Sequence, residues 1–248
     1  MAEPIVSWYL EENKAANEIT GTVNYGTVDA DTQSATKTMF IWNNRAGATD
    51  VAKMQNVQYT TRDRKGGLGD TVGSVVEAVK NNWFNVRVDT LDEVDFKPVG
   101  KGGAGTANVS GVAVLGTKGV TKNPKAAKAV AWAASTELSV GAIIAPKTEN
   151  GFVYEVKTAG TTGTDAPTFV TVEDQEVADG TVVFVALAKE HKPGEGEILG
   201  AANAAAADGS NVADAAGNFA KVSVYVDVPV DASAGKNLLI QRVFYQYV

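Results

Sequence analysis

A strict alternation of apolar and other side chains is the feature that most restricts how this chain can fold. In 219–230, FAKVSVYVDVPV, four valines alternate with serine, tyrosine and aspartate. In 84–91, FNVRVDTL, Phe84, Val86 and Val88 alternate with polar residues. A period of two places successive side chains on opposite faces of a sheet. Both segments are therefore predicted to be half-buried β-strands.

Four further segments favour strands. They are 20–28, 36–44, 57–63 and 238–248. The second contains a continuous apolar run, MFIW, and the last is largely apolar up to the C-terminal residue. An ordered apolar terminus is usually paired into a sheet. Together, these patterns predict an all-β protein.

The segment 70–82, DTVGSVVEAVKNN, is ambiguous. Val72, Val75, Val76 and Val79 have the spacing of one helical face. Gly73 and the four valines, however, are poor helix formers. Helix and strand both remain open for this segment.

Two segments rich in glycine and alanine, 99–125 and 194–218, are typical of linkers or surface loops. Structureless loops of about 20 residues are uncommon inside compact domains, so we favour a small β-domain inserted between two hinges. On this interpretation, residues 1–115 form the first part of a β-sandwich, 126–192 the inserted module and 203–248 the closing strands. The alternative is one irregular β-domain with long loops.

Composition restricts the class of partner. The 248 residues carry a net charge of -7, whereas a nucleic-acid-binding protein needs a basic face to displace counterions from phosphates. No apolar run approaches the roughly 20 residues of a membrane-spanning helix. The chain has no cysteine, which excludes disulfides and thiolate sites. We therefore expect neither nucleic acid nor membrane as a partner, and the acidic start MAEPIVSWYLEENK does not resemble a signal peptide.

Catalytic patterns are weak. His191 is the single histidine and lies in AKEHKPGEG, a composition typical of an exposed loop. One histidine cannot form a multi-histidine metal site, and the chain has no G-x-S-x-G motif for a serine nucleophile. The glycine-rich segment 66–73 lacks the G-K-[ST] ending of a phosphate-binding loop. DADT, 29–32, lacks the glycine and terminal glutamate of a calcium loop.

Carboxylates at Glu173, Asp174, Glu176 and Asp179 could supply an acid and a base. Their clustering in one short segment instead favours a solvated turn. We therefore predict no catalytic residue, no metal site and no cofactor.

Aromatic residues offer the one candidate binding surface. Trp132, Phe152, Tyr154, Phe169 and Phe184 all lie in the predicted inserted module. Sugar rings stack on exposed aromatic side chains, but a small β-domain also needs aromatic residues for its core. Trp132, Tyr154 and Phe169 are the candidate surface-binding residues, with a core role as the alternative.

The segment 24–51, NYGTVDADTQSATKTMFIWNNRAGATDV, resembles a recurrent immunoglobulin-like pattern. In that pattern an aromatic-Gly-x-Val strand leads through a polar turn into an apolar strand ending in Asn-Asn. The C-terminal segment 222–248 resembles the last hairpin of such domains, with VPVDASAG, 228–235, as its turn. The IWNNR form of the pattern is similar to structural proteins of tailed bacteriophages and prophages. This resemblance implies an immunoglobulin-like β-sandwich with a small inserted β-domain.

The segment 130–187 resembles a small β-module of phage tail, fibre and head-decorating proteins. The shared pattern comprises W-A-A-x-T, V-G-x-x-x-x-P, N-G-x-x-Y, T-A-G-T-T-G, a Pro-Thr-aromatic step and D-G-T-V. This chain has Phe169 and Phe184 where the pattern often has tryptophan, and this departure weakens a sugar-stacking role.

These resemblances imply a non-enzymatic structural protein of a tailed phage or phage-like particle. The implied location is the virion, in the tail at the baseplate or fibre attachment, after assembly in the host cytoplasm. Its expected partners are other virion proteins and copies of itself. Three alternatives remain: a capsid head-decoration protein, an adhesin whose inserted module binds host surface glycan, and a hydrolase, which the lack of a catalytic pattern disfavours. Exposed Trp132 and Tyr154 would favour the adhesin, and burial of both would count against it.

Overall fold

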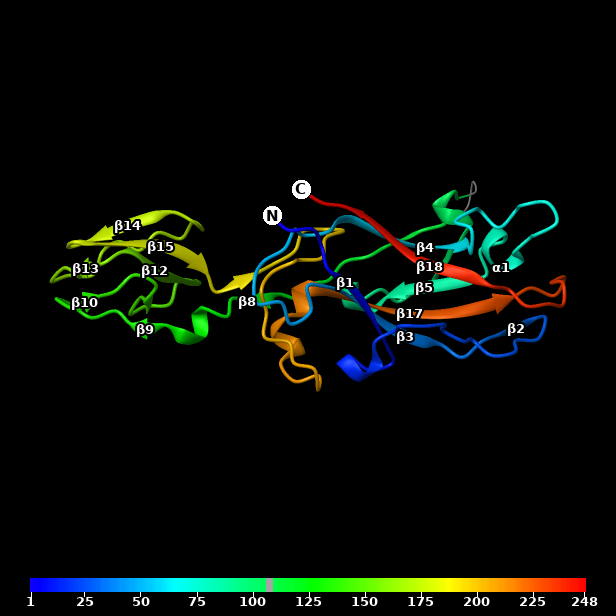
Figure 1. Ribbon diagram of the computed structural model, residues 1–248, viewed down its shortest axis with the longest axis horizontal. Coiled ribbons are helices and arrows are strands. Elements are labelled where there is room, and N and C mark those ends of the chain that lie inside the picture. Colours follow the sequence, from blue (N-terminus) through cyan, green and yellow to red (C-terminus); the bar gives the residue numbers. More distant parts are fainter. Residues whose placement is uncertain (106–108) are drawn as a thin grey trace. The chain divides into compact units, whose positions relative to one another are not determined.

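The computed structural model describes residues 1–105 and 109–248, and it is all-β (Figure 1). Strands account for 37% of the residues and helical turns for only 9%, so β-sheet packing determines the fold. The chain forms two compact units, one of residues 1–120 and 192–248 and the other of residues 121–191. The inserted module expected from the sequence was 126–192. Residues 106–108 of the predicted loop 99–125 lie outside the described residues.

The first unit contains a six-stranded antiparallel sheet built around the valine-rich strand predicted at 219–230. The strands in order are β1 (Val6–Leu10), β3 (Lys37–Asn43), β17 (Phe219–Val228), β5 (Phe84–Val88) and β6 (Lys97–Val99), with β2 (Thr32–Gln33) also on β17. Val222 of β17 is opposite Met39 of β3 and Val88 of β5. The alternating valines therefore place one continuous apolar face on three neighbouring strands.

A second sheet packs on that face. Its order is β18 (Leu239–Gln246), β4 (Gln55–Asp63) and β7 (Ala113–Val114). Val57 and Tyr59 of β4 share one buried cluster with Val86 and Val224 of the first sheet. The first unit is therefore a β-sandwich.

The expectation that the last two strands form a hairpin is wrong. β17 pairs with β3, β5 and β2, whereas β18 pairs with β4 in the other sheet. The segment 229–238 therefore crosses from one sheet to the other. Pro229 and Gly235 interrupt the strands as expected, but a break in a strand does not specify which neighbour the next strand joins.

The predicted strand at 20–28 is also wrong. Val23, Tyr25 and Val28 are half-buried, and the ring of Tyr25 packs edge-on against Phe84 with centroids 5.2 Å apart. The segment nevertheless has no strand assignment. It covers the core with its side chains while its main chain stays outside both sheets.

Most of 70–82 is neither helix nor strand. Among the described residues, the one α-helix is α1 (Glu77–Lys80). Val72 is 97% exposed and only Val79 of the four valines is buried. Gly73 has a left-handed φ of 77°, which breaks the helical path, so the helical spacing of the valines does not correspond to a buried face.

The second glycine- and alanine-rich segment, 194–218, is not a hinge. Ile198 and Ala215 are fully buried, and Ile198 pairs with Met54 beside β4. Gly200 lies close to the main chain of the segment between β3 and β4. A Cβ atom at this position would be 2.4 Å from the carbonyl oxygen of Val51. The short side chains of this segment therefore permit close packing against the sandwich. The six short 3₁₀ turns of the described residues are η1 (Ala15–Asn17), η2 (Asp89–Leu91), η3 (Lys101–Gly103), η4 (Ala126–Lys128), η5 (Val212–Asp214) and η6 (Ala216–Asn218).

The second unit has its own sheet and core. Its five-stranded sheet has the order β14 (Glu176–Asp179), β15 (Val182–Ala188), β12 (Phe152–Thr158), β11 (Ile143–Ala145) and β9 (Val130–Ala131). Two smaller pairs are β10 (Glu137–Leu138) with β13 (Gly160–Thr161), and β8 (Thr121–Lys122) with β16 (Glu190–His191). Because β8 begins the unit and β16 ends it, the entering and leaving chains are paired with each other.

Candidate functional site

The three predicted surface-binding residues lie in the core of the second unit. Trp132 is 4% exposed, Tyr154 is 0% exposed and Phe169 is half-buried. The rings of Tyr154 and Phe169 pack with centroids 4.5 Å apart. Trp132 and Tyr154 therefore cannot stack on a sugar from solvent, and the prediction of an aromatic surface is corrected. A unit of 71 residues, 121–191, uses its large rings to build a core.

The polar atoms of these rings are satisfied inside the unit. Trp132 Nε1 donates to Asp179 Oδ2 at 2.7 Å, and the hydroxyl of Tyr154 donates to the carbonyl oxygen of Val170 at 2.7 Å. Burial raises the pKa of Tyr154. Asp179 is 5% exposed, so the expectation that it belongs to a solvated carboxylate cluster is wrong. Its carboxylate is a structural acceptor.

His191 lies in β16, although the sequence favoured an exposed loop. Its Nδ1 atom is 3.7 Å from Glu173 Oε1. Within residues 1–105 and 109–248, no group of three or more histidine, aspartate or glutamate residues could hold a metal ion. The arrangement at His191 brings together one imidazole and one exposed carboxylate.

Each polar residue of the IWNNR motif, 41–45, forms hydrogen bonds within the sandwich. The amide nitrogen of Asn43 donates to the carbonyl oxygen of Ala52 at 2.9 Å. The amide nitrogen of Asn44 donates to the carbonyl oxygens of Thr49 and Gly200, each at 2.8 Å. These two buried amides join the end of β3 to the segment that follows it and to the distant residue Gly200.

Arg45 completes this structure. Its guanidinium lies 4.4 Å from the ring centroid of Tyr9 and 4.8 Å from that of Trp42. It also donates to the carbonyl oxygen of Asn13 at 2.9 Å. Cation–π contact and hydrogen bonding together tie the N-terminal segment to β3, so the motif stabilises the sandwich and presents no free functional group.

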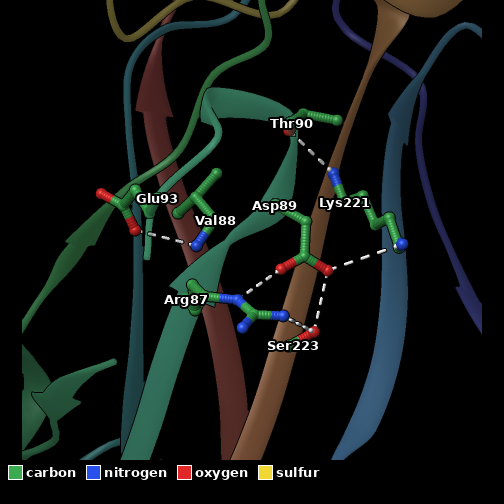
Figure 2. Close-up of polar contacts among 7 residues, drawn as sticks. All are labelled: Arg87, Val88, Asp89, Thr90, Glu93, Lys221 and Ser223. Carbon is green, nitrogen blue, oxygen red and sulfur yellow. Dashed lines mark hydrogen bonds and ion pairs between the residues drawn. The ribbon is translucent and has the colours of Figure 1, made fainter. Parts of the chain in front are cut away.

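A charged cluster lies on the outward face of the six-stranded sheet. Figure 2 shows Asp89 between Arg87 and Ser223. Asp89 accepts from Arg87 Nε and from Ser223 Oγ, each at 2.8 Å, and Lys221 Nζ lies 3.7 Å from Asp89 Oδ2. The cluster is therefore an ion-pair network that joins β5 to β17.

A second charged feature was missed by the sequence reasoning. We call five cations on adjoining segments the basic corner: Arg62 in β4, Arg64 and Lys65 in the turn after it, Lys101 in η3 and Arg242 in the paired strand β18. Arg62 donates to the carbonyl oxygens of Gly66 at 2.6 Å and Gly102 at 3.1 Å, which brings the turn 64–67 and η3 together. The run RDRK, 62–65, is visible in the sequence, but only the fold brings Lys101 and Arg242 beside it.

Comparison with known proteins identifies no relative: no family model, curated protein or solved structure matches the chain. Throughout the described ranges, no helix is both long and apolar enough to span a membrane. Inference about function therefore depends on the geometry of the two units and on their surfaces.

Proposed function

We propose that this chain is a non-enzymatic structural protein of a tailed phage or phage-like particle, and that it belongs to the tail, at the baseplate or fibre attachment. The observation that carries the proposal is the insertion of one β-unit within another. The chain leaves the sandwich after Val120 and returns at Lys192, and the two connecting strands pair with each other. A paired connection is suited to presenting a separate unit without disturbing the sandwich that holds it.

In this role the sandwich docks on neighbouring subunits and the inserted unit meets solvent, a neighbouring subunit or a host surface. Docking through a sheet edge is available because β18 is the outer strand of its sheet. Symmetric repetition of such contacts generates rings and tubes. The net charge of -7 favours solubility of the subunit before assembly.

A capsid head-decoration role uses the same two units and differs only in the partner. The adhesin alternative is weakened, because burial of Trp132 and Tyr154 removes the aromatic surface on which it depended. Tail attachment therefore stands as the proposal, with head decoration as the alternative outcome of its test.

A phage that carries a stop codon in this reading frame tests the proposal. Growth in a host without suppressor tRNA should yield filled heads whose tails lack the baseplate or fibres in electron micrographs. Expression of the intact chain from a plasmid should restore infectivity. Normal, infectious particles lacking the chain would contradict a structural role in the tail.

A further inference from the structure

β18 presents an unpaired main-chain edge. Seven of its eight residues pair with β4, with a register shift between Phe244 and Gln246. Within residues 1–105 and 109–248 its main chain has no backbone hydrogen bond to any other segment. The nearby segment 20–28 reaches β18 through a side chain, since the hydroxyl of Tyr25 donates to Gln241 Oε1 at 3.2 Å. A row of unpaired N–H and C=O groups is a template for one more extended strand.

The side chains of β18 determine which side chains an added strand needs at each position. Leu239, Val243 and Tyr245 pack on the sandwich core, so the adjoining positions of an added strand must be apolar. Ile240 and Arg242 are on the other face and exposed. Side chains directly opposite one another on paired strands have Cβ atoms roughly 5 Å apart, so one side chain of the added strand must lie beside Arg242.

The surroundings of Arg242 are basic. Arg242 is opposite Thr60 of β4, and Arg62 lies two residues along β4. Arg64 and Lys65 follow in an exposed turn. Within residues 1–105 and 109–248, none of the five residues of the basic corner forms an ion pair. The protein has 29 acidic and 22 basic residues, and yet among the described residues the cations of this corner lie without a carboxylate partner.

The one acidic residue within 62–65 does not neutralise the corner. Asp63 is 6% exposed, and its Oδ1 atom accepts from the main-chain N–H groups of Lys65 and Gly67, each at 2.8 Å. Its carboxylate is thus committed to the turn. A partner that neutralises the corner must bring its own negative charge.

We propose that the free edge of β18 binds an extended acidic segment of a partner protein by strand addition. The segment alternates apolar side chains, toward the core, with side chains on the outer face that include a carboxylate beside Arg242. Pairing of β18 with the same strand of a second copy is disfavoured, because it brings two Arg242 side chains close together. The inference rests on the proposed function in one respect: it takes the partner to be a neighbouring virion subunit.

The test uses the full chain and a fluorescent eight-residue peptide of alternating valine and glutamate, matched to the eight residues of β18. Binding is followed by fluorescence anisotropy at low salt. One control peptide carries lysine in place of glutamate. The other carries methyl groups on the main-chain nitrogens that would pair with β18. The variant is R64E with R242E, both exposed positions. Its matched control is K128E with K192E, which changes the net charge equally at exposed positions elsewhere.

The proposal predicts that the valine–glutamate peptide binds and that both control peptides fail to bind. R64E with R242E should weaken binding by roughly tenfold, and K128E with K192E should leave it unchanged. Absence of binding to the folded full chain would overturn the proposal. Equal binding of the N-methylated peptide, or equal competition by inorganic polyphosphate, would also overturn it, because the corner would then be a general anion-binding surface. None of these outcomes depends on where the chain lies in a particle.

Discussion

The indole nitrogen of Trp132 donates a 2.7 Å hydrogen bond to the carboxylate of Asp179, and both side chains are buried. Trp132 directly follows β9 and Asp179 is the last residue of β14, so the bond joins the two opposite edges of the five-stranded sheet. Asp179 also accepts from the N–H group of Gly163 at 2.8 Å. One carboxylate thus holds together three segments of the second unit.

Replacement of Asp179 by alanine should therefore destabilise the second unit. The change leaves a buried indole N–H and a main-chain N–H without their acceptor, and we expect a loss of about 1–3 kcal/mol in the free energy of unfolding. Urea unfolding followed by tryptophan fluorescence measures the loss. Glu176→Ala is the matched control, because Glu176 forms only an exposed ion pair with Lys157 and should cost less than about 1 kcal/mol. Equal effects of the two substitutions would show that the Trp132–Asp179 bond has no structural importance.

Asn44→Ala should destabilise the sandwich by about 1–3 kcal/mol, because the carbonyl oxygen of the buried residue Gly200 loses its donor. Asn44 is 3% exposed and has a left-handed φ of 58°. Asn211→Ala is the control, because Asn211 has nearly the same φ, 59°, but is exposed. The difference between the two variants in urea midpoint isolates the hydrogen bonds from the backbone strain. A difference near zero would contradict the role given to the IWNNR motif.

Local patterns predicted the strands well and their partners poorly. The segments 36–44, 57–63 and 219–230 correspond closely to β3, β4 and β17, because a period of two reports which residues are buried. The period does not report which edge a strand joins, and so the expected C-terminal hairpin was wrong. At 20–28 the apolar side chains are half-buried as expected. The segment forms no strand, because strand pairing also needs a neighbouring strand, and the sequence of the segment does not say whether one is there.

The candidate site was less predictable than the fold. Trp132 and Tyr154 were recognised as belonging together, but a single sequence cannot distinguish a ring in a core from a ring on a surface. The buried carboxylate of Asp179 lies near exposed acids in the sequence, and its indole partner is 47 residues away. The basic corner likewise depends on the pairing of β18 with β4. Each of these features is made by contacts between distant segments.

Alkaline pH should destabilise the sandwich. Burial raises the pKa of both Tyr25 and Tyr59 above the ordinary value of 10.0. The folded state therefore holds these phenol protons above about pH 10, where the unfolded state releases them. Stability is unaffected below that pH and falls as the pH rises above it, by at most about 1.4 kcal/mol per pH unit for each tyrosine.

Urea unfolding between about pH 8 and pH 11 checks this pH dependence. Tyr25→Phe should reduce the slope above about pH 10, because one of the two buried phenols is removed. An unchanged slope in that variant would contradict the assignment of the pH dependence to this pair.

The two units should fold separately. Thr121 and His191 are opposite one another in the β8–β16 pair, so a short glycine-serine linker can replace 121–191 without moving the ends of the sandwich. We expect the shortened sandwich and the isolated segment 121–191 each to show a cooperative transition in calorimetry. Failure of both parts to fold would contradict the division into two units.

Labelling of purified particles with a gold-tagged antibody against 130–187 tests the proposed virion role most directly. Our account predicts label at the tail tip or fibres in electron micrographs and peptides of this chain in mass spectra of the same particles. Label distributed over the head would contradict tail attachment and identify a capsid-decorating protein. Absence of both label and peptides from intact particles would contradict a virion role altogether.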